Sequence, residues 1–411
     1  FVAGESNKSI RLYNKGKGHL NWKASVSASW ITVTPALGAL IPTDSVTLSV
    51  VVSRAGLPME ATATIELTSN SVYGPVTIPV IVTASNGFAS GLTVLDHRVV
   101  DAEASASAEL IVTVSAFPHQ LHILDALTGT IEHVSLSAPP TCVAIRPDGV
   151  FAAVGHDASM TLVDLRSRSV VRQSPVPVDV LDLVLPMNGW AYAFPRRDQW
   201  TAIHSVQLSS GTVTTQMNHP GIYAGTLGRL HPSGDFMYGS ENNISPADHV
   251  KFDIRDGAAQ LMYDSRYHGD YPMGSDAWIS DDGSRLFNRA AHVFRLSPNP
   301  ADDIVYAGRL GGATVLLQWV SDAPQFGRIL ALRDEASGPE SMQLHVYDRS
   351  TLGFTASRSL PSFTNGASGV AAHGKFAFPL RDRAYILVRA DAGGGLLRDW
   401  GIVAFDRGQI P

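Results

Sequence analysis

Short apolar segments of strand length recur along the chain of 411 residues, and turn-forming residues separate them. Residues 46–52, 62–68 and 76–82 alternate between apolar and polar positions or run apolar, which is typical of strands. No apolar pattern with the helical period extends over a useful length. The patterning therefore predicts an all-β protein.

The first 85 residues fit an immunoglobulin-like β-sandwich of about seven strands. Pro79 lies inside the apolar segment 76–82. Because proline cannot donate a hydrogen bond to a neighbouring strand, we expect this segment at a sheet edge or at a bulge.

From residue 92 onward the chain repeats. Turn glycines with similar surroundings lie at Gly149, Gly189, Gly234 and Gly283, and weaker copies of the turn lead to Gly327 and Gly374. Successive glycines are 40 to 49 residues apart, and one step backwards leads to a further turn at 105–108. A second marker, an aspartate after an apolar pair, recurs at Asp125, Asp164, Asp253 and Asp348.

A repeat of this length with only strand-length apolar segments predicts a β-propeller, because stacked four-stranded sheets bury faces that a single sheet would expose. The second unit shows the four strands at 142–145, 151–154, 160–165 and 170–173. Seven blades over residues 92–411 fit best, with six and eight as the alternatives. Residues 91–100 either begin the first blade or supply the outer strand of the last.

The repeat units resemble YVTN/NHL-like seven-bladed propellers. They carry Pro-Asp-Gly at 147–149 between the first and second strands and a Val-x-Asp in the third. They lack the Gly-His and Trp-Asp pairs of WD40 repeats. This is a likeness in repeat pattern and implies no catalytic signature.

The N-terminal segment has a motif of its own. Residues 30–38 follow the pattern Trp-Ile-x-Val-x-Pro-x-x-Gly, and Asn14-Lys-Gly16 and Leu20-Asn-Trp22 precede it. Over residues 5–85 the segment resembles the BACON domain, an immunoglobulin-like module named for its association with Bacteroidetes and carbohydrate binding. It departs from that family at 59–61, where Met-Glu-Ala stands in place of a frequent Gly-x-Tyr. The resemblance implies an extracytoplasmic protein and glycan or mucin contact, but it assigns no binding residues.

Trp22 and Trp30 have two interpretations. Their rings stack on a sugar, or they fill the core of the sandwich, as large aromatic side chains usually do. Both lie beside alternating apolar positions, which favours the core.

Composition narrows the classes of function. The net charge of −6 and the absence of a basic, aromatic stripe argue against nucleic acid as a partner. The single cysteine, Cys142, excludes a disulfide framework and a cysteine-based zinc site. The apolar runs are too short to span a bilayer, so we expect no transmembrane segment. Because the chain starts at Phe1 without a signal-like segment, we expect that a targeting signal has been removed.

Alignment of the units places polar residues between the second and third strands of every predicted blade. These loops, and the connections between blades, share one rim of a propeller around the channel mouth. Arginines there bind a planar anionic or polar group, or they pair with aspartates of adjacent blades. The tyrosines of the connection 263–271 take part in recognition or pack over the channel. The candidate ligand-binding residues are His156, Asp157, Arg196, Arg197, Asp198, Glu241, Asn242, Tyr267, Tyr271, Arg289, Arg333, Asp334, Arg381 and Arg383.

The sequence contains no nucleophile elbow, no His-Glu-x-x-His motif and no phosphate-binding glycine loop. We therefore expect no catalytic residues, no cofactor and no bound metal. One alternative keeps a metal in the channel, with His156, His204, His292 and His373 brought together by the fold.

The sequence thus predicts a bacterial, extracytoplasmic two-domain protein. A BACON-like sandwich at 1–85 and a linker at 86–91 precede a seven-bladed propeller at 92–411. The expected function is non-catalytic binding of a glycan or a surface protein through the propeller rim. The alternatives are a metal-dependent hydrolase or lactonase and an architectural subunit of a cell-envelope assembly. Oligomeric state is left open.

Overall fold

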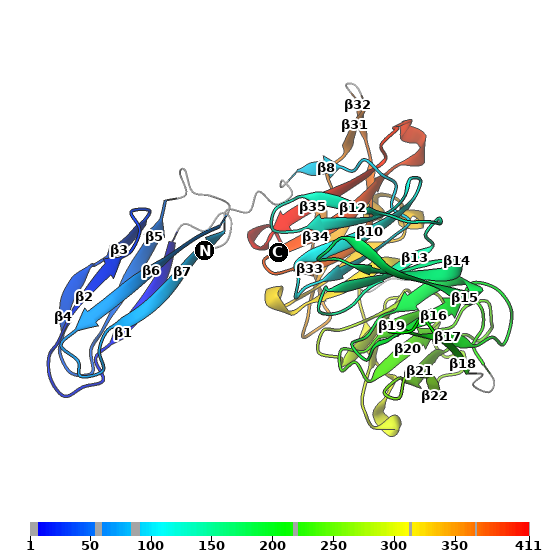
Figure 1. Ribbon diagram of the computed structural model, residues 1–411, viewed down its shortest axis with the longest axis horizontal. Helices are drawn as coiled ribbons and strands as arrows, with labels where there is room; N and C mark the ends of the chain where they lie inside the picture. Colours follow the sequence, from blue (N-terminus) through cyan, green and yellow to red (C-terminus); the bar gives the residue numbers. More distant parts are fainter. Residues whose placement is uncertain are drawn as a thin grey trace. The chain divides into compact units, whose positions relative to one another are not determined.

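A computed structural model describes residues 7–53, 60–83, 91–216, 221–311, 315–365 and 368–410 (Figure 1). The chain divides into two compact units: residues 1–87 with 127–129, and residues 88–126 with 130–411. The predicted linker 86–91 lies, except for Gly91, outside the described residues. The boundaries drawn from the sequence at 85 and 92 stay predictions.

The first unit is a β-sandwich whose two sheets have the strand orders β1-β5-β3 and β4-β2-β6-β7. The strand β7, which contains Pro79, lies at a sheet edge, as its missing N–H requires. The strands are β1(Asn7–Tyr13), β2(Leu20–Val26), β3(Ile31–Thr34), β4(Leu37–Leu40), β5(Ser45–Val52), β6(Glu60–Ser69) and β7(Val76–Thr83).

Trp22 is a core residue of the sandwich and is 5% exposed. Trp30 is partly buried and packs against the same cluster of apolar side chains. Gly38 lies on the Trp22 ring, where an added Cβ would come within 3.0 Å of the indole. The core interpretation of Trp22 is therefore confirmed, and part of the BACON-like motif is explained by packing around it.

The second unit is a seven-bladed β-propeller, in which each blade is an antiparallel four-stranded sheet. Blades two and three are joined into one six-stranded sheet, because the long strands β14(Phe151–Asp164) and β15(Ser169–Val184) each serve two blade positions. The first six blades use β9–β12, β13–β15, β15–β18, β19–β22, β23–β26 and β27–β30.

The last blade closes the ring. Its sheet has the order β33-β34-β35-β8, so the first strand of the unit, β8(Leu92–Val94), supplies the outer strand beside β35(Trp400–Asp406). Of the two interpretations of residues 91–100, the structure selects the outer strand of the last blade. Joining the two ends of the ring in one sheet removes two exposed sheet edges.

The remaining strands follow the predicted repeat. They are β9(Asp101–Ser105), β10(Leu110–Ala116), β11(His119–Asp125), β12(Ile131–Ser135), β13(Cys142–Ile145), β14(Phe151–Asp164), β15(Ser169–Val184), β16(Trp190–Pro195), β17(Ile203–Gln207), β18(Val213–Gln216), β19(Leu227–Leu230), β20(Phe236–Ser240), β21(His249–Asp253), β22(Gln260–Asp264), β23(Ala277–Ile279), β24(Arg285–Asn288), β25(His292–Arg295), β26(Val305–Arg309), β27(Leu317–Ala323), β28(Arg328–Arg333), β29(Gln343–Asp348), β30(Phe354–Ser359), β31(Phe363–Asn365), β32(Ser368–Val370), β33(Ala372–Leu380) and β34(Arg383–Ala390). Short 3₁₀ turns complete the described structure: η1(Pro300–Asp302), η2(Pro324–Phe326), η3(Glu335–Met342), η4(Ala392–Gly394) and η5(Arg407–Gln409). No helix among the described residues is long and apolar enough to cross a membrane.

The recurrent aspartates end the third strand of their blades and shape the turn that follows. Asp164 Oδ1 accepts hydrogen bonds from the backbone N–H groups of Arg166 and Ser167. Asp348 Oδ1 accepts from Ser350 and Thr351 in the same way. An aspartate that satisfies the first N–H groups of a turn favours chain reversal, which explains its place in the repeat.

One part of the repeat alignment is wrong. Gly374 lies inside the strand β33 rather than in a turn, and the turn of the last blade is Arg381-Asp382 between β33 and β34. The hairpin β31–β32 is inserted between blades six and seven, and it shifted the alignment. Arg381 and Arg383 therefore do not belong to a loop between second and third strands, as the sequence had predicted. They lie on the opposite face.

Candidate functional site

A channel along the propeller axis is lined by the first strands of the blades. We call the face that carries the turns between first and second strands the lower face, and the opposite one the upper face. Three cavities follow the channel, with volumes of about 290 Å³ at the lower end, 190 Å³ in the middle and 290 Å³ at the upper mouth. The lower and middle cavities share Glu103, Arg229 and Trp319 as lining residues, so they adjoin along the channel.

Arg229, on β19, is the charged centre of the channel. Its Nη2 lies 2.6 and 2.7 Å from the two carboxylate oxygens of Asp276, and its Nη1 lies 3.2 Å from Asp182 Oδ2. Its Nε donates to the carbonyl of Ala277 and its Nη1 to that of Gly228. The carboxylates raise the pKa of Arg229 although burial alone would lower it. The guanidinium is thus permanently charged and fully engaged with the protein.

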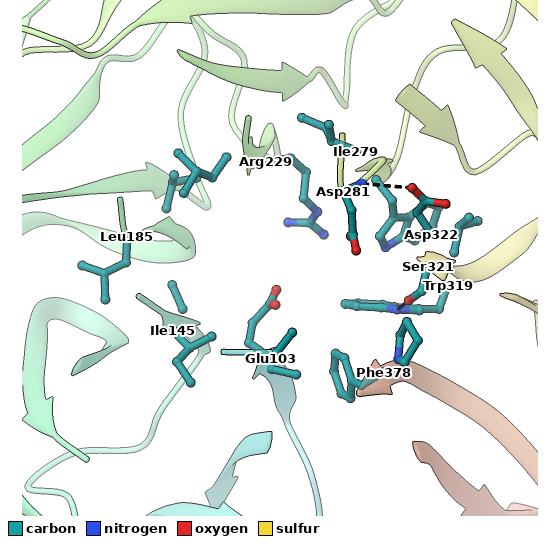
Figure 2. Close-up of a pocket in the computed structure, with 18 of the residues that line it drawn as sticks. Glu103, Ile145, Leu185, Arg229, Ile279, Asp281, Trp319, Ser321, Asp322 and Phe378 are labelled. Atoms are coloured by element: carbon teal, nitrogen blue, oxygen red, sulfur yellow. Dashed lines mark hydrogen bonds between the residues drawn. The ribbon is translucent and has the colours of Figure 1, made fainter. Parts of the chain in front are cut away.

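Two further carboxylates face Arg229 across the lower cavity. Figure 2 shows Glu103, Arg229 and Asp281 pointing toward one another into the channel. Neither the Glu103 nor the Asp281 side chain has a hydrogen-bond donor among the described residues. Desolvation raises the pKa of Glu103 to about 8 and that of Asp281 to about 6. These two groups are therefore available to a ligand that donates hydrogen bonds or carries positive charge.

The first strand of blade one adds a fifth acid, Asp101, in the middle of the channel. Asp101 Oδ2 accepts a hydrogen bond of 2.8 Å from the Val143 N–H, and desolvation raises the Asp101 pKa to about 7. Asp182 accepts from Gly228 N–H in the matching position two blades on. Each aspartate ties one first strand to the next around the axis. The local surplus of carboxyl groups over Arg229 makes the channel acidic.

Aromatic rings form one wall of the lower cavity. Trp319 Nε1 donates to the carbonyl of Ala377 at 2.9 Å, which fixes the indole between blades six and seven. Its ring makes edge contacts with Trp278 and Phe378, at centroid distances of 5.8 and 5.5 Å. Asp322, in the same cavity, is neutralised by Arg349 at 2.7 Å. A cavity with an aromatic wall and free carboxylates has the two chemistries that hold sugar rings: stacking surface and hydroxyl acceptors.

The upper mouth contains two of the residues predicted from the loops. Asn242 and Arg289 line it together with Ser275, Asp276 and Gln318. Arg289 is paired with Asp334 of the next blade, and the Asn242 side chain holds the backbone of Ser275 and Gly225. The side chains of Ser275 and Gln318 have no hydrogen-bond partner among the described residues. Polar groups from blades four, five and six thus meet at this mouth.

Most of the predicted rim arginines pair with carboxylates. Arg196 lies 3.5 Å from Asp157 of the preceding blade, and Arg197 lies 3.1 Å from Asp179. Arg333 pairs with Glu340 inside its own loop. Asp334 also caps η3 by accepting from Ala336 N–H. The Arg196–Asp157 and Arg289–Asp334 pairs fit the inter-blade interpretation of the rim, and ion pairing leaves fewer rim arginines free to bind a ligand.

The remaining predicted rim residues either pack against neighbouring groups of the protein or are exposed in a loop. His156 is fully buried, and its two ring nitrogens contact the Pro139 carbonyl and Thr161 Oγ1. Tyr271 stacks on Tyr306 at 4.4 Å and touches Tyr267 edge-on, so the tyrosines pack between blades four and five. Glu241 is almost buried, with its pKa raised to about 7 chiefly by desolvation, and Asp198 is exposed in its loop.

Arg381 and Arg383, on the lower face, are not brought to the rim. Arg383 is bound to Asp406 at 2.6 Å. Arg381 is exposed in its turn. The ring of arginines predicted from the alignment therefore includes neither of them.

The four histidines proposed to share a channel metal are held apart. None of them lines the cavities, and three are bound to a hydroxyl: His156 to Thr161, His204 to Thr215 and His373 to Ser341. His292 packs instead against Tyr271 and Tyr306. Among the described residues, the one group of three side chains spaced to hold a metal is Asp96, His97 and His122, which lies elsewhere.

Sequence comparison between blades could have found the channel residues. Asp101 begins β9, Asp276 directly precedes β23, and Asp182 lies in the part of β15 that serves as a first strand. Each of the three accepts a hydrogen bond from the next backbone N–H. An aspartate that recurs inside or beside the apolar segment of a first strand is therefore a second repeat signal, independent of the turn glycines. Glu103, Arg229 and Asp281 have no such repeat, and only their position in first strands or the turn after them marks them.

Comparison with known proteins agrees with the two folds. Residues 1–85 match the family model described as the viral BACON domain. That description names viral domains, so a bacterial origin stays a prediction. No curated protein matches the chain.

Two solved structures resemble the propeller. The β-propeller domain of Cps50 (Swd1) from Myceliophteria thermophila has a TM-score of 0.57 at 10% identity, over 76% of this chain and 98% of that one. Hydrazine synthase from Kuenenia stuttgartiensis has a TM-score of 0.55 at 12% identity, over 76% of this chain and 97% of that one. At these identities the likeness concerns the fold alone.

Proposed function

We propose that the protein is a non-catalytic, extracytoplasmic binding protein whose propeller channel holds a glycan. The observation that carries this proposal is the pair of free carboxyl groups, Glu103 and Asp281, facing an aromatic wall in one 290 Å³ cavity. Sugar hydroxyls donate to carboxylates, and the C–H face of a sugar packs on aromatic rings.

The charge of the channel refines the expected ligand. The carboxyl groups outnumber the one lining arginine, and Arg229 has its donors occupied by Asp182, Asp276 and two carbonyls. A neutral or amino-bearing sugar therefore fits better than an acidic one, since an anion would meet like charge in a poorly hydrated site. This differs from the anion-binding arginine rim expected from the sequence.

Two observations support a glycan over a surface protein as the ligand. The free polar groups lie in concavities on the axis, whereas the rim arginines are paired with neighbouring carboxylates. The BACON match at residues 1–85 adds support, because the resemblance implies glycan contact. The same resemblance supports the extracytoplasmic location.

A glycan array probed with the full chain tests the proposal, followed by calorimetric titration of the strongest glycan. The double variant Glu103→Ala/Asp281→Ala removes both free carboxyl groups of the lower cavity. We expect it to weaken binding about tenfold, because Glu103, with its pKa raised to about 8, is largely neutral near pH 7 and each lost hydrogen bond is worth about 0.5–1.5 kcal/mol.

Arg381→Gln is the matched control. Arg381 is exposed on the same lower face but does not line the cavity, so its removal should leave the affinity unchanged. Loss of binding with Arg381→Gln but not with the double variant, or no glycan bound by the unmodified chain, would contradict the proposal.

A further inference from the structure

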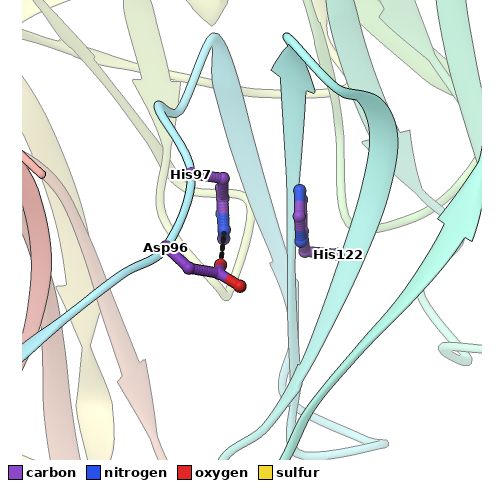
Figure 3. Close-up of side chains that lie close together, drawn as sticks. All are labelled: Asp96, His97 and His122. Atoms are coloured by element: carbon purple, nitrogen blue, oxygen red, sulfur yellow. Dashed lines mark hydrogen bonds and ion pairs between the residues drawn. The ribbon is translucent and has the colours of Figure 1, made fainter.

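Three side chains with metal-binding chemistry meet where the propeller ring closes. Asp96 and His97 follow the closing strand β8, and His122 lies on β11 of blade one (Figure 3). Each of the three offers a ligand atom, and these atoms lie within 4.8 Å of one another. His97 Nδ1 is 3.0 Å from Asp96 Oδ1. No cavity of the channel includes these residues, so the cluster is separate from the proposed glycan site.

The far nitrogen of each imidazole is anchored by a hydroxyl group of strand β10. His97 Nε2 lies 2.9 Å from Thr113 Oγ1, and His122 Nε2 lies 2.9 Å from Ser115 Oγ. Thr113 and Ser115 are fully buried, so the two contacts hold the Nε2 end of each ring and leave the Nδ1 end able to turn toward an ion. Anchoring one imidazole nitrogen in this way leaves the other to serve as a ligand, as is usual in protein metal sites.

The two histidines of the cluster are buried, whereas the aspartate is exposed to solvent. His97 and His122 are 5% and 4% exposed, whereas the Asp96 side chain is 69% exposed. An ion can therefore reach the cluster from solvent at Asp96 and then contact the two rings. Two imidazoles and one carboxylate form a donor set suited to zinc and other late first-row divalent ions, with further positions left for water.

We propose that Asp96, His97 and His122 bind one divalent transition-metal ion of the zinc class. The histidine rings lie face to face, with centroids 3.4 Å apart and planes 5° from parallel. Lone pairs of parallel rings do not converge, so the ion must tilt the rings apart. The ring spacing already suits a shared ion, because ligands at about 2.0–2.2 Å from a tetrahedral ion lie about 3.3–3.6 Å from one another.

The position of the site indicates what the ion does. Asp96 and His97 belong to the segment that leads from the outer strand of the last blade into blade one, while His122 belongs to blade one itself. The segment is already held by Leu95 N–H to the Trp400 carbonyl and by the Arg98–Asp399 ion pair at 3.0 Å. A bound ion adds a third tie at the ring closure and stabilises the folded chain by mass action.

The experiment uses the full chain after dialysis against a chelator. Zinc is titrated by calorimetry, and cobalt is added separately to follow its visible absorption, which reports nitrogen and oxygen ligation. Asp96→Asn and His122→Asn are the test variants, and His133→Asn is the matched control. His133 is an exposed histidine whose ring centroid lies 6.4 Å from that of His122, outside the cluster.

We expect one zinc ion per chain, a rise in melting temperature with zinc, and at least a tenfold loss of affinity in both test variants. The control should keep the full affinity. Asp96 is largely exposed, so Asp96→Asn tests the site even if His122→Asn fails to fold. No zinc binding, or equal affinity in the unmodified chain and in folded Asp96→Asn, would overturn the proposal. Loss of affinity confined to His133→Asn would overturn it as well, since it would place the ion on surface histidines.

Discussion

The Lys251 ammonium lies 2.7 Å from the Asp303 carboxylate, and both side chains are buried, 2% and 0% exposed, between blades four and five. Tyr238 and Tyr263 donate their hydroxyls to the same carboxylate. Lys251 also lies over the Phe236 ring at 4.6 Å. A buried charge pair with its remaining oxygen positions satisfied locks two adjacent sheets in one register.

Removing the lysine should destabilise the propeller strongly. Lys251→Met leaves Asp303 buried without its counter-charge, so the free energy of unfolding should fall by about 3–5 kcal/mol. The control is Arg255→Met, because the Arg255 side chain is 58% exposed and its pairing with Asp253 on the surface should contribute little to stability. Urea unfolding followed by circular dichroism measures both. Equal losses in the two variants would show that the buried pair does not hold the blades.

Acidification should destabilise the fold through buried neutral histidines. His249 is fully buried, and desolvation lowers its pKa to about 3. Because the unfolded chain binds the proton more readily, this histidine stabilises the fold above pH 6.5, and the contribution is lost as the pH falls toward 3. Between pH 7 and pH 5 the loss should be about 2 kcal/mol.

His249→Asn should flatten this pH dependence by removing the titrating group. Unfolding free energies of the unmodified chain and the variant at pH 5 and pH 7 give the comparison. His133→Asn removes an exposed histidine, so its unfolding free energy should change with pH as much as that of the unmodified chain. If the unfolding free energy of His249→Asn changed between pH 5 and pH 7 as much as that of the unmodified chain, other groups would cause the acid sensitivity.

The Glu103 side chain in the channel should make the folded chain less stable as the pH rises, opposite to the effect of His249. Desolvation raises the pKa of Glu103 to about 8, so the folded chain holds this proton more tightly than the unfolded chain. Stability is complete below the ordinary pKa near 4.5 and is lost as the pH rises through 8. Glu103→Gln should remove that loss, and its melting temperature should fall less between pH 6 and pH 9. Asp256→Asn, in an exposed turn, is the control and should follow the unmodified chain.

Ring closure should depend on the glycine that faces β8. A Cβ added at Gly401 would lie 2.5 Å from Leu92 Cδ1 and 3.0 Å from the Thr93 carbonyl oxygen. Gly401→Val therefore forces β8 away from β35, and we expect a loss of several kcal/mol and faster hydrogen exchange in residues 92–94. Gly408→Ala, which meets no atom within 4 Å, should have little effect. Unchanged exchange in Gly401→Val would mean that β8 does not close the ring.

The architecture follows from the sequence because it is repeated. The turn glycines and the aspartates after third strands mark the same position in successive blades, so their spacing predicted the propeller and most of its strands. The alignment failed at Gly374, where the inserted β31–β32 hairpin changed the length of one repeat. Spacing alone does not distinguish an insertion from a longer loop, and Arg381 and Arg383 were assigned to the wrong face for that reason.

The candidate site was less accessible to sequence reasoning. Glu103 and Arg229 lie on first strands, where polar side chains interrupt apolar segments without forming a motif. Their meeting depends on the axial geometry of blades that are far apart in the chain. The rim arginines were conspicuous in the sequence, yet Arg196 and Arg289 pair with Asp157 and Asp334 of adjacent blades. The conspicuous charges of Arg196 and Arg289 on this rim thus form ion pairs between adjacent blades.

A crystal structure of the full chain with its bound glycan tests the central proposal most directly. We predict a sugar residue in the lower cavity, with hydroxyl groups within hydrogen-bond distance of Glu103 and Asp281 and its ring against the aromatic wall that includes Trp319. A glycan bound to the first unit or on the outer rim, with the channel holding only water, would contradict it.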